Sequence, residues 1–326
     1  MYLLDIDKDL YNILIQLFEE IIDPLFHYVS PDPFFKEDMT KYITLYKAYI
    51  DYNDLVSKTL MNYVNTKTII YLHDYQFFFV PNKLYSNFKH NKDLFQNLSI
   101  GLFMHSPFPS FDVFKSINYR EEILKSILKC RVIGFHTFDS SRNFLESSKK
   151  LLSINLVSTN DGELAANYLE FNTLIRVKNV SPEIKLLEKD INSDEFKKYY
   201  NDLTKKYSEK KIFVYTDYMK FLVSIKNKLE GYRKFLRELG EKANKIVFLL
   251  YIRYSDDEID EKGNLLLEKN QNLMIQKIDD LTNKIKKEFG DDVIELYKGL
   301  LPYKQRIALF ACADCFVRTS KKESYS

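Results

Sequence analysis

The sequence is poor in glycine and contains no tryptophan: 8 of its 326 residues are Gly. Average usage would make glycine about 7% of a chain. No two of these glycines stand one residue apart, so the sequence has no G-x-G spacing. Loops that bring backbone N–H groups close to a phosphate usually need glycine at such positions. The composition therefore offers no glycine-rich phosphate-binding loop.

Neither sign of charge dominates the chain. Lys and Arg number 48 against 46 Asp and Glu, which gives a net charge of +2. This balance provides no electrostatic basis for binding nucleic acid or an acidic membrane surface. The longest apolar stretches, residues 77–81 and 247–252, are too short to cross a bilayer. Met1 opens an acidic segment that lacks a signal-peptide pattern, and we expect a cytoplasmic protein.

Cysteine is scarce as well. Cys130, Cys312 and Cys315 cannot all pair with one another, so they do not form a secreted disulfide framework. Cys312 and Cys315 have a C-x-x-C spacing, which occurs in redox and metal sites and also where small residues pack at a helix end. No second Cys pair or nearby His completes a metal site. We therefore expect packing, with no metal and no cofactor.

Short apolar runs alternate with helical periodicity from about residue 67 onward. We expect strands at residues 68–72, 98–104 and 131–135, and in the second half at 212–215, 245–252, 293–297 and 315–317. Helices lie between them, and Asp139 is the expected N-cap of one that runs to Leu152. Alternating β and α elements predict an α/β fold of parallel sheets with helices on both faces. Residues 153–211 interrupt this rhythm with polar sequence, so we place a boundary near residue 180 between domains 1–180 and 181–326.

Polar residues follow the first-half strands where each strand ends. They are His73 and Asp74, His105, and His136, so three of the five histidines stand at strand ends. Because parallel strands share one carboxyl edge, these side chains should converge where ligands bind such sheets. A lone histidine there is usually structural, whereas three together favour a functional site. His136 has a second interpretation, because the helix after it could turn its ring into the core.

Long blocks of the first half resemble the trehalose-6-phosphate synthase family. They are residues 24–28 (PLFHY), 73–75 (HDY), 100–110 (IGLFMHSPFPS), 119–124 (YREEIL) and 132–139 (VIGFHTFD). In the second half, residues 217–229 and 303–320 follow the family's order more weakly. The blocks are long and occur in the right order, so the resemblance is specific over residues 20–150.

This resemblance implies two facing Rossmann-like domains of the B-type glycosyltransferase fold. It also implies glucosyl transfer from UDP-glucose to glucose 6-phosphate, with retention at the anomeric carbon and without a metal. By position, Asp74 and His105 would be the catalytic residues, and Asp74, His105 and His136 would bind substrate. A carboxylate and an imidazole are suited to orienting a hydroxylated ring.

Several positions depart from the family pattern. The family has an Arg directly after the Asp matched by Asp217 and a Lys five residues later, whereas this chain has Tyr218 and Val223. The family's acidic, glycine-containing loop is replaced by residues 321–326 (KKESYS), in which Glu323 is the one carboxylate. We therefore expect two incomplete domains and a catalytically impaired or regulatory copy.

Two alternatives stay open: an active synthase represented by a truncated sequence, and a module that binds a sugar phosphate without transferring it. The expected partners are a sugar phosphate and either a trehalose-synthase complex or a second copy of the chain.

Overall fold

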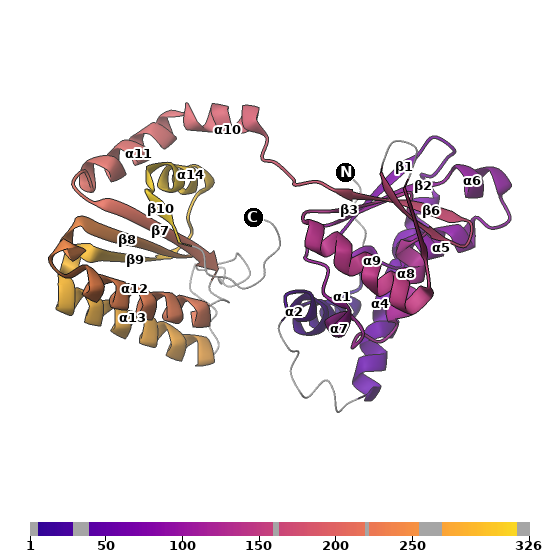
Figure 1. The fold of residues 1–326 in the computed structure, drawn as a ribbon, viewed down its shortest axis with the longest axis horizontal. Helices are drawn as coiled ribbons and strands as arrows, with labels where there is room; N and C mark the ends of the chain where they lie inside the picture. Colours follow the sequence, from indigo (N-terminus) through magenta and orange to yellow (C-terminus); the bar gives the residue numbers. More distant parts are fainter. Residues whose placement is uncertain (1–5, 29–38, 159–162, 219–221, 254–268, 318–326) are drawn as a thin grey trace. The chain divides into compact units, whose positions relative to one another are not determined.

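The structure is a computed structural model that describes residues 6–28, 39–158, 163–218, 222–253 and 269–317. The chain divides into two compact units between Ser181 and Pro182. The elements of both units are labelled in Figure 1. Among the described residues, no helix combines the length and the apolar character needed to cross a membrane.

The first unit is built on a six-stranded sheet with the strand order β1-β2-β3-β6-β5-β4. Its strands are β1 (Ile69–His73), β2 (Ser99–Met104), β3 (Val132–Phe135), β4 (Asn155–Ser158), β5 (Leu164–Tyr168) and β6 (Phe171–Val177). β1, β2, β3 and β6 run parallel, while β4 and β5 join the sheet antiparallel. The strands expected before residue 150 are confirmed to within a residue or two.

The two strands that join the sheet antiparallel, β4 and β5, were not predicted from the sequence. Residues 153–177 contain three short strands in which polar and apolar residues mix, such as Leu164–Tyr168 (LAANY). Short half-polar strands at a sheet edge have a weak sequence signal, because one face and one edge can meet water. The polar break seen in the sequence therefore contains the edge of the first sheet.

Helices pack on one face of this sheet (Figure 1). The helical segments are α1 (Lys8–Leu17), a π-helical turn (Phe18–Ile22), α2 (Asp23–Phe26), α4 (Met39–Met61), a 3₁₀ turn (Tyr75–Phe77), α5 (Val80–Asn87), α6 (Lys92–Asn97), α7 (Phe111–Phe114), α8 (Arg120–Ile127) and α9 (Phe138–Leu152). Their apolar residues form one core with alternate strand residues, among them Ile70, Leu102 and Ile133. Burial of this shared face holds the unit together.

The N-cap of α9 differs from the expectation. Thr137, not Asp139, caps the helix, with its Oγ1 accepting from the N–H of Ser140 at 3.2 Å. Asp139 lies in the first turn, where its carboxylate pairs with Arg142 at 3.1 Å and interacts favourably with the helix dipole. Both residues suit a helix N-terminus, so sequence alone could not assign the cap.

The opposite face of the first sheet has no helical layer among the described residues. The register places Tyr71, Gly101, Val132 and Leu174 in one row on that face, and none of them belongs to the core. Ile69 and Tyr71 remain 79% and 58% exposed. The predicted helices on both faces are therefore wrong for the described part of this sheet. β1, β2 and β3 lie side by side in the sheet in the same order as in the chain. Right-handed crossovers between them therefore place the connecting helices on the same face.

The second unit contains a four-stranded parallel sheet with the order β10-β7-β8-β9. Its elements are α10 (Ile184–Ile191), α11 (Asp194–Lys206), β7 (Lys211–Tyr218), α12 (Leu222–Leu239), a 3₁₀ turn (Gly240–Lys245), β8 (Ile246–Arg253), α13 (Lys269–Phe289), a 3₁₀ turn (Asp291–Val293), β9 (Ile294–Gly299), α14 (Tyr303–Cys312) and β10 (Cys315–Phe316). The strands expected in the second half are confirmed with small shifts of their ends.

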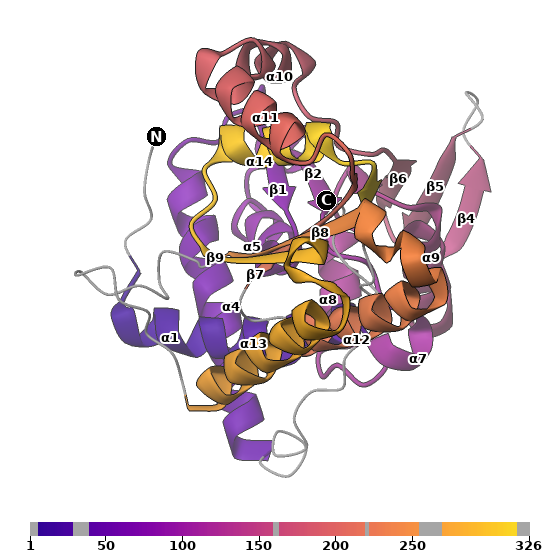
Figure 2. The same ribbon diagram turned by 90° about the vertical axis from the view of Figure 1, so that its left-hand side faces the viewer.

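This second sheet is covered on both faces, as the sequence predicted. One core cluster joins the sheet to α12 and α13, and another joins it to α11 and α14 (Figure 2). The strand order explains the difference between the units. After β9 the chain returns to β10 on the far side of β7, so α14 crosses the other face.

We expect the uncovered face of the first sheet to cause self-association. Contiguous exposed apolar residues and an unpaired edge strand favour aggregation. Light scattering at micromolar concentration should show large particles for the wild type and fewer for Ile69→Lys, which adds a charge to an exposed position.

The matched control is Ile70→Lys, one residue further along β1, where the side chain is in the core. This change should unfold the unit instead of dispersing the particles, because it buries an unpaired charge. A wild-type chain that stays monomeric throughout would contradict the expectation.

Candidate functional site

The carboxyl ends of β1, β2 and β3 bring together the residues singled out in the sequence. The Nδ1 atom of His73 lies 3.0 Å from Nε2 of His105, within hydrogen-bonding distance. The rings of His105 and His136 have centroids 5.4 Å apart. Asp74, next to His73, bonds to Ser106, next to His105. Asp74, His105 and His136 thus lie at one edge of the sheet, while their functional roles remain a prediction.

Asp74 is held in an unusual backbone conformation. Its φ is 65° and its ψ is −174°, a region that residues other than glycine rarely adopt. The N–H of Asp74 donates to the carbonyl of Phe103 at 2.8 Å. Its carboxylate accepts from the N–H of Ser106 at 3.2 Å and from the Ser106 hydroxyl at 2.9 Å. These bonds hold a strained residue in place, so the carboxylate is fixed before any ligand arrives.

Burial governs the protonation of this carboxyl group. Desolvation raises the pKa of Asp74 above its ordinary value, although the hydrogen bonds from Ser106 and the nearby His105 act in the opposite direction. The ionised form is therefore less stable in the folded protein than in water. A carboxylate held at such a cost is typical of groups that bind ligands or take part in reactions.

The histidines form a compact aromatic group around Phe103. The Phe103 ring centroid lies 4.9 Å from both the His105 and the His136 rings. Burial lowers the pKa values of His73 and His136, and the neighbouring His105 lowers them further. His136 is 8% exposed, so its ring is largely inside the protein. The two rings of lowered pKa favour the neutral form, which can both donate and accept a hydrogen bond.

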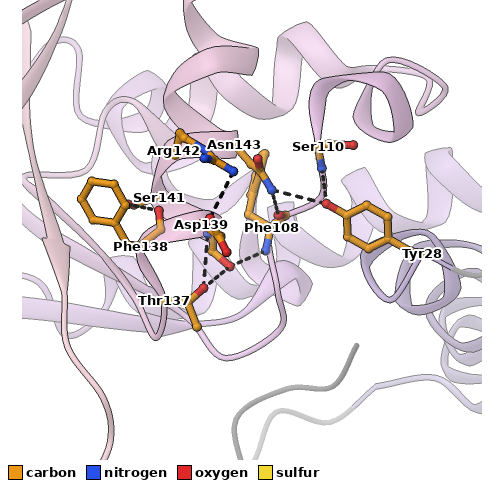
Figure 3. A network of polar contacts seen from close by, with 10 residues as sticks. Tyr28, Phe108, Ser110, Thr137, Phe138, Asp139, Ser141, Arg142 and Asn143 are labelled. Atoms are coloured by element: carbon orange, nitrogen blue, oxygen red, sulfur yellow. Dashed lines mark hydrogen bonds and ion pairs between the residues drawn. The ribbon is translucent and has the colours of Figure 1, made fainter. Parts of the chain in front are cut away.

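A polar network fixes the loop that follows His105 (Figure 3). The hydroxyl oxygen of Tyr28 accepts from the N–H of Ser110 at 2.8 Å and from Nδ2 of Asn143 at 3.3 Å. Asn143 also donates to the carbonyl of Phe108 at 3.0 Å, and the Ser140 hydroxyl accepts from the N–H of Phe108 at 3.2 Å. The loop at residues 105–110 is therefore tied to α9 and to the end of α2.

Sequence reasoning missed Ser106, Tyr28 and Asn143 as supporting residues. Ser106 directly follows His105, which was a usable signal. Tyr28 and Asn143 meet across 115 residues of chain, and no local pattern indicates such a contact.

The residues that depart from the family pattern lie outside what the structure describes in detail. The backbone of β7 ends at Tyr218 and α12 begins at Leu222, but the side chains of Asp217, Tyr218 and Val223 are not described. Residues 318–326, which include Glu323, are also outside the described residues. The donor side of the predicted site is therefore known from sequence alone.

Cys312 of the C-x-x-C spacing packs against the core formed by the second sheet, α11 and α14. Cys312 ends α14 and its Sγ donates to the carbonyl of Leu309 at 3.2 Å, while Cys315 begins β10. Burial raises the pKa of the Cys312 thiol to about 11, which leaves it protonated and unreactive at neutral pH. No group of His, Cys, Asp or Glu in the described residues is arranged to hold a metal ion.

Two units, each with a Rossmann-like sheet built around parallel strands, together with a polar strand edge in the first, define a protein of the B-type glycosyltransferase fold. Residues 3–326 match the family model of glycosyltransferase family 20, and the chain belongs to this family. The predicted family and fold class are thereby confirmed.

Known relatives are named as synthases. The chain is 26% identical over 305 residues to the alpha,alpha-trehalose-phosphate synthase [UDP-forming] 56 kDa subunit of Saccharomyces cerevisiae, with 92% of this chain and 57% of the relative covered. It is 27% identical over 310 residues to a synthase of Aspergillus niger, with 93% and 55% covered. The chain thus spans little more than half the length of these relatives.

Solved structures show the same fold. The N-terminal domain of Candida albicans trehalose-6-phosphate phosphatase matches with a TM-score of 0.79 at 20% identity. The match covers all of this chain and 64% of the Candida albicans chain. A Burkholderia xenovorans alpha,alpha-trehalose-phosphate synthase in complex with glucose-6-phosphate has a TM-score of 0.77 at 14% identity, with 98% and 66% covered.

Gly134 should be intolerant of a side chain. A Cβ atom at this position would lie 2.5 Å from Cδ2 of Phe103, the ring that contacts His105 and His136. We expect Gly134→Ala to lower the free energy of unfolding by about 1–3 kcal/mol through overpacking, measured by urea denaturation.

Gly101→Ala on the neighbouring strand is the matched control. Its Cβ would lie 3.2 Å from the exposed ring of Tyr71, which can move aside. The free energy of unfolding should fall by less than about 1 kcal/mol in this variant. Equal unfolding midpoints for the two variants would show that Phe103 is not fixed in place.

Proposed function

We propose that the first unit binds a glucosyl unit or glucose 6-phosphate, and that the chain is a catalytically impaired or regulatory copy of a trehalose-6-phosphate synthase. One observation carries the proposal: the Asp74 carboxylate, fixed on Ser106, lies beside His105 at the carboxyl edge of parallel strands. Ligands bind open α/β sheets at that edge.

The chemistry of these groups suits a sugar. A carboxylate with several lone pairs accepts hydrogen bonds from adjacent hydroxyls, and an imidazole donates to or accepts from a third. In a synthase, Asp74 and His105 would orient the glucosyl ring, and His136 would line the same site. Preorganised groups of this kind are effective because they need no rearrangement when the substrate binds.

Transfer requires more than orientation of the sugar. Departure of UDP develops negative charge on a pyrophosphate, which cations and backbone amides must stabilise. Tyr218 and Val223, which stand where the family has Arg and Lys, carry no charge. Removing one preorganised donor typically costs a factor of about 10²–10³ in rate. The two replacements together support impaired transfer.

Two other functions have support from the relatives. An active synthase represented by part of its sequence agrees with the coverage of 57% of the yeast relative. That relative is named a subunit, which favours a partner role in a trehalose-synthase complex or a homo-oligomer. The fold also occurs in a protein named as a phosphatase, so the fold alone does not decide between these roles. A cytoplasmic location belongs to the same proposal.

Asp74→Asn should separate binding from stability. Because hydrogen bonds to charged groups contribute about 1.5–3 kcal/mol, glucose 6-phosphate binding measured by calorimetry should weaken about tenfold or more. Stability should not fall at pH 7. The pKa of Asp74 is raised in the folded state, so its contribution to stability is present at low pH and lost as pH rises through that value.

The variant should therefore be at least as stable as the wild type at pH 7. The stability advantage of the variant over the wild type should shrink as the pH falls toward about 3.9, the pKa of an Asp carboxyl in the unfolded chain. At that pH the wild-type carboxyl is protonated in the folded protein. Urea denaturation at both pH values checks this order. A variant that is less stable at pH 7 and binds normally would identify Asp74 as a structural residue.

The donor side gives a separate prediction. Calorimetry should show UDP-glucose binding no tighter than millimolar, because uncharged residues stand at positions 218 and 223. The double variant Tyr218→Arg, Val223→Lys should tighten it about tenfold or more, since charge-assisted bonds to phosphate are strong.

Glu230→Lys is the control for this experiment. It changes the net charge by the same amount on the exposed part of α12, where Glu230 pairs with Lys226 at 3.5 Å. It should leave donor binding unchanged. A micromolar constant for the wild type would contradict the impaired donor site.

A further inference from the structure

We infer that His73 is a positioning residue that fixes the tautomer and ring plane of His105, and so determines which ring nitrogen meets the sugar. The inference about ligand binding rests on the proposed function. The inference about His105 itself rests on geometry alone.

Two consecutive bonds join the ends of β1 and β2. His73 bonds to His105, and Asp74, the next residue, bonds to Ser106. The positive φ of Asp74 turns the chain directly after His73. The two bonds therefore tie the strand ends together at the point where the chain leaves β1.

The His73 ring is itself supported. Its plane is 24° from that of His105, with centroids 5.2 Å apart, so the two rings lie nearly parallel. The Tyr71 and His73 rings form a T-shaped contact with centroids 4.4 Å apart. Tyr71 lies across Gly101, where the absence of a side chain gives it room. The His73 ring thus contacts a second ring besides that of His105.

The bond to His73 couples the tautomer of His105 to that of His73 and leaves Nδ1 of His105 available to a ligand. A neutral imidazole has one donor and one acceptor nitrogen. If Nε2 of His105 accepts from His73, its Nδ1 carries the proton, and if Nε2 donates, its Nδ1 is an acceptor. Within the described residues this is the one hydrogen bond of the His105 ring, so Nδ1 remains for a hydroxyl. The orienting partner of a functional histidine commonly sets its tautomer in this way.

The test compares His73→Leu with His73→Asn. Leucine fills similar space without a polar atom, whereas the asparagine amide lies where Nδ1 was and preserves a bond. Two-bond ¹⁵N–¹H spectra of the five histidines report the tautomer of each ring, and His105→Gln assigns its signal. We expect a single His105 tautomer in the wild type and in His73→Asn, and a mixture in His73→Leu.

Calorimetry with glucose 6-phosphate gives the second readout. His73→Leu should weaken binding about three- to tenfold, the range for one neutral hydrogen bond, and His73→Asn should restore it. Averaged tautomers in the wild type, or an unchanged His105 signal in His73→Leu, would overturn the inference. If the wild type binds no glucose 6-phosphate, the proposed function fails, while the spectra still decide the role of His73.

Discussion

The parallel register of β1, β2 and β3 is the constraint on which the candidate site depends. His73 stands opposite Phe103 in β1 and β2, and Phe103 stands opposite Gly134 in β3. This alignment puts three strand ends at one level, so that His105 and its neighbours meet. A slip of one residue would move a whole strand's side chains to the other face. The alternation of apolar residues that buries Ile70 in the core also fixes the register of β1, and so the position of the polar residues at its carboxyl end.

Much of the fold was predictable because the parallel strands are apolar and the helices periodic. The convergence of Asp74, His105 and His136 at one edge followed from the same rule about parallel strands. The uncovered face of the first sheet was not predictable, because it depends on strand order, which no local pattern contains. The same holds for Ser106 and Tyr28, whose partners are set by the packing of distant segments. Asp74 shows a further limit, since nothing in its sequence context indicates a positive φ.

The site groups are held by interactions that the core alone does not require. Asp74 retains a strained backbone and a buried carboxyl group, each of which costs free energy. Ser106 compensates by donating both its N–H and its hydroxyl. If Asp74 served the fold alone, an uncharged residue with an ordinary φ could end the same strand at a lower cost in free energy. The retention of a costly carboxylate is the physical argument that the edge binds something.

The proposed impairment of donor binding and the fold of the second unit involve different residues. Its two cores are built from apolar residues of the strands and helices, such as Val214, Leu229 and Leu250. Position 218 ends β7 and position 223 lies in the first turn of α12. The core residues named here are different residues from Tyr218 and Val223, so the proposed impairment of donor binding does not require a change in them.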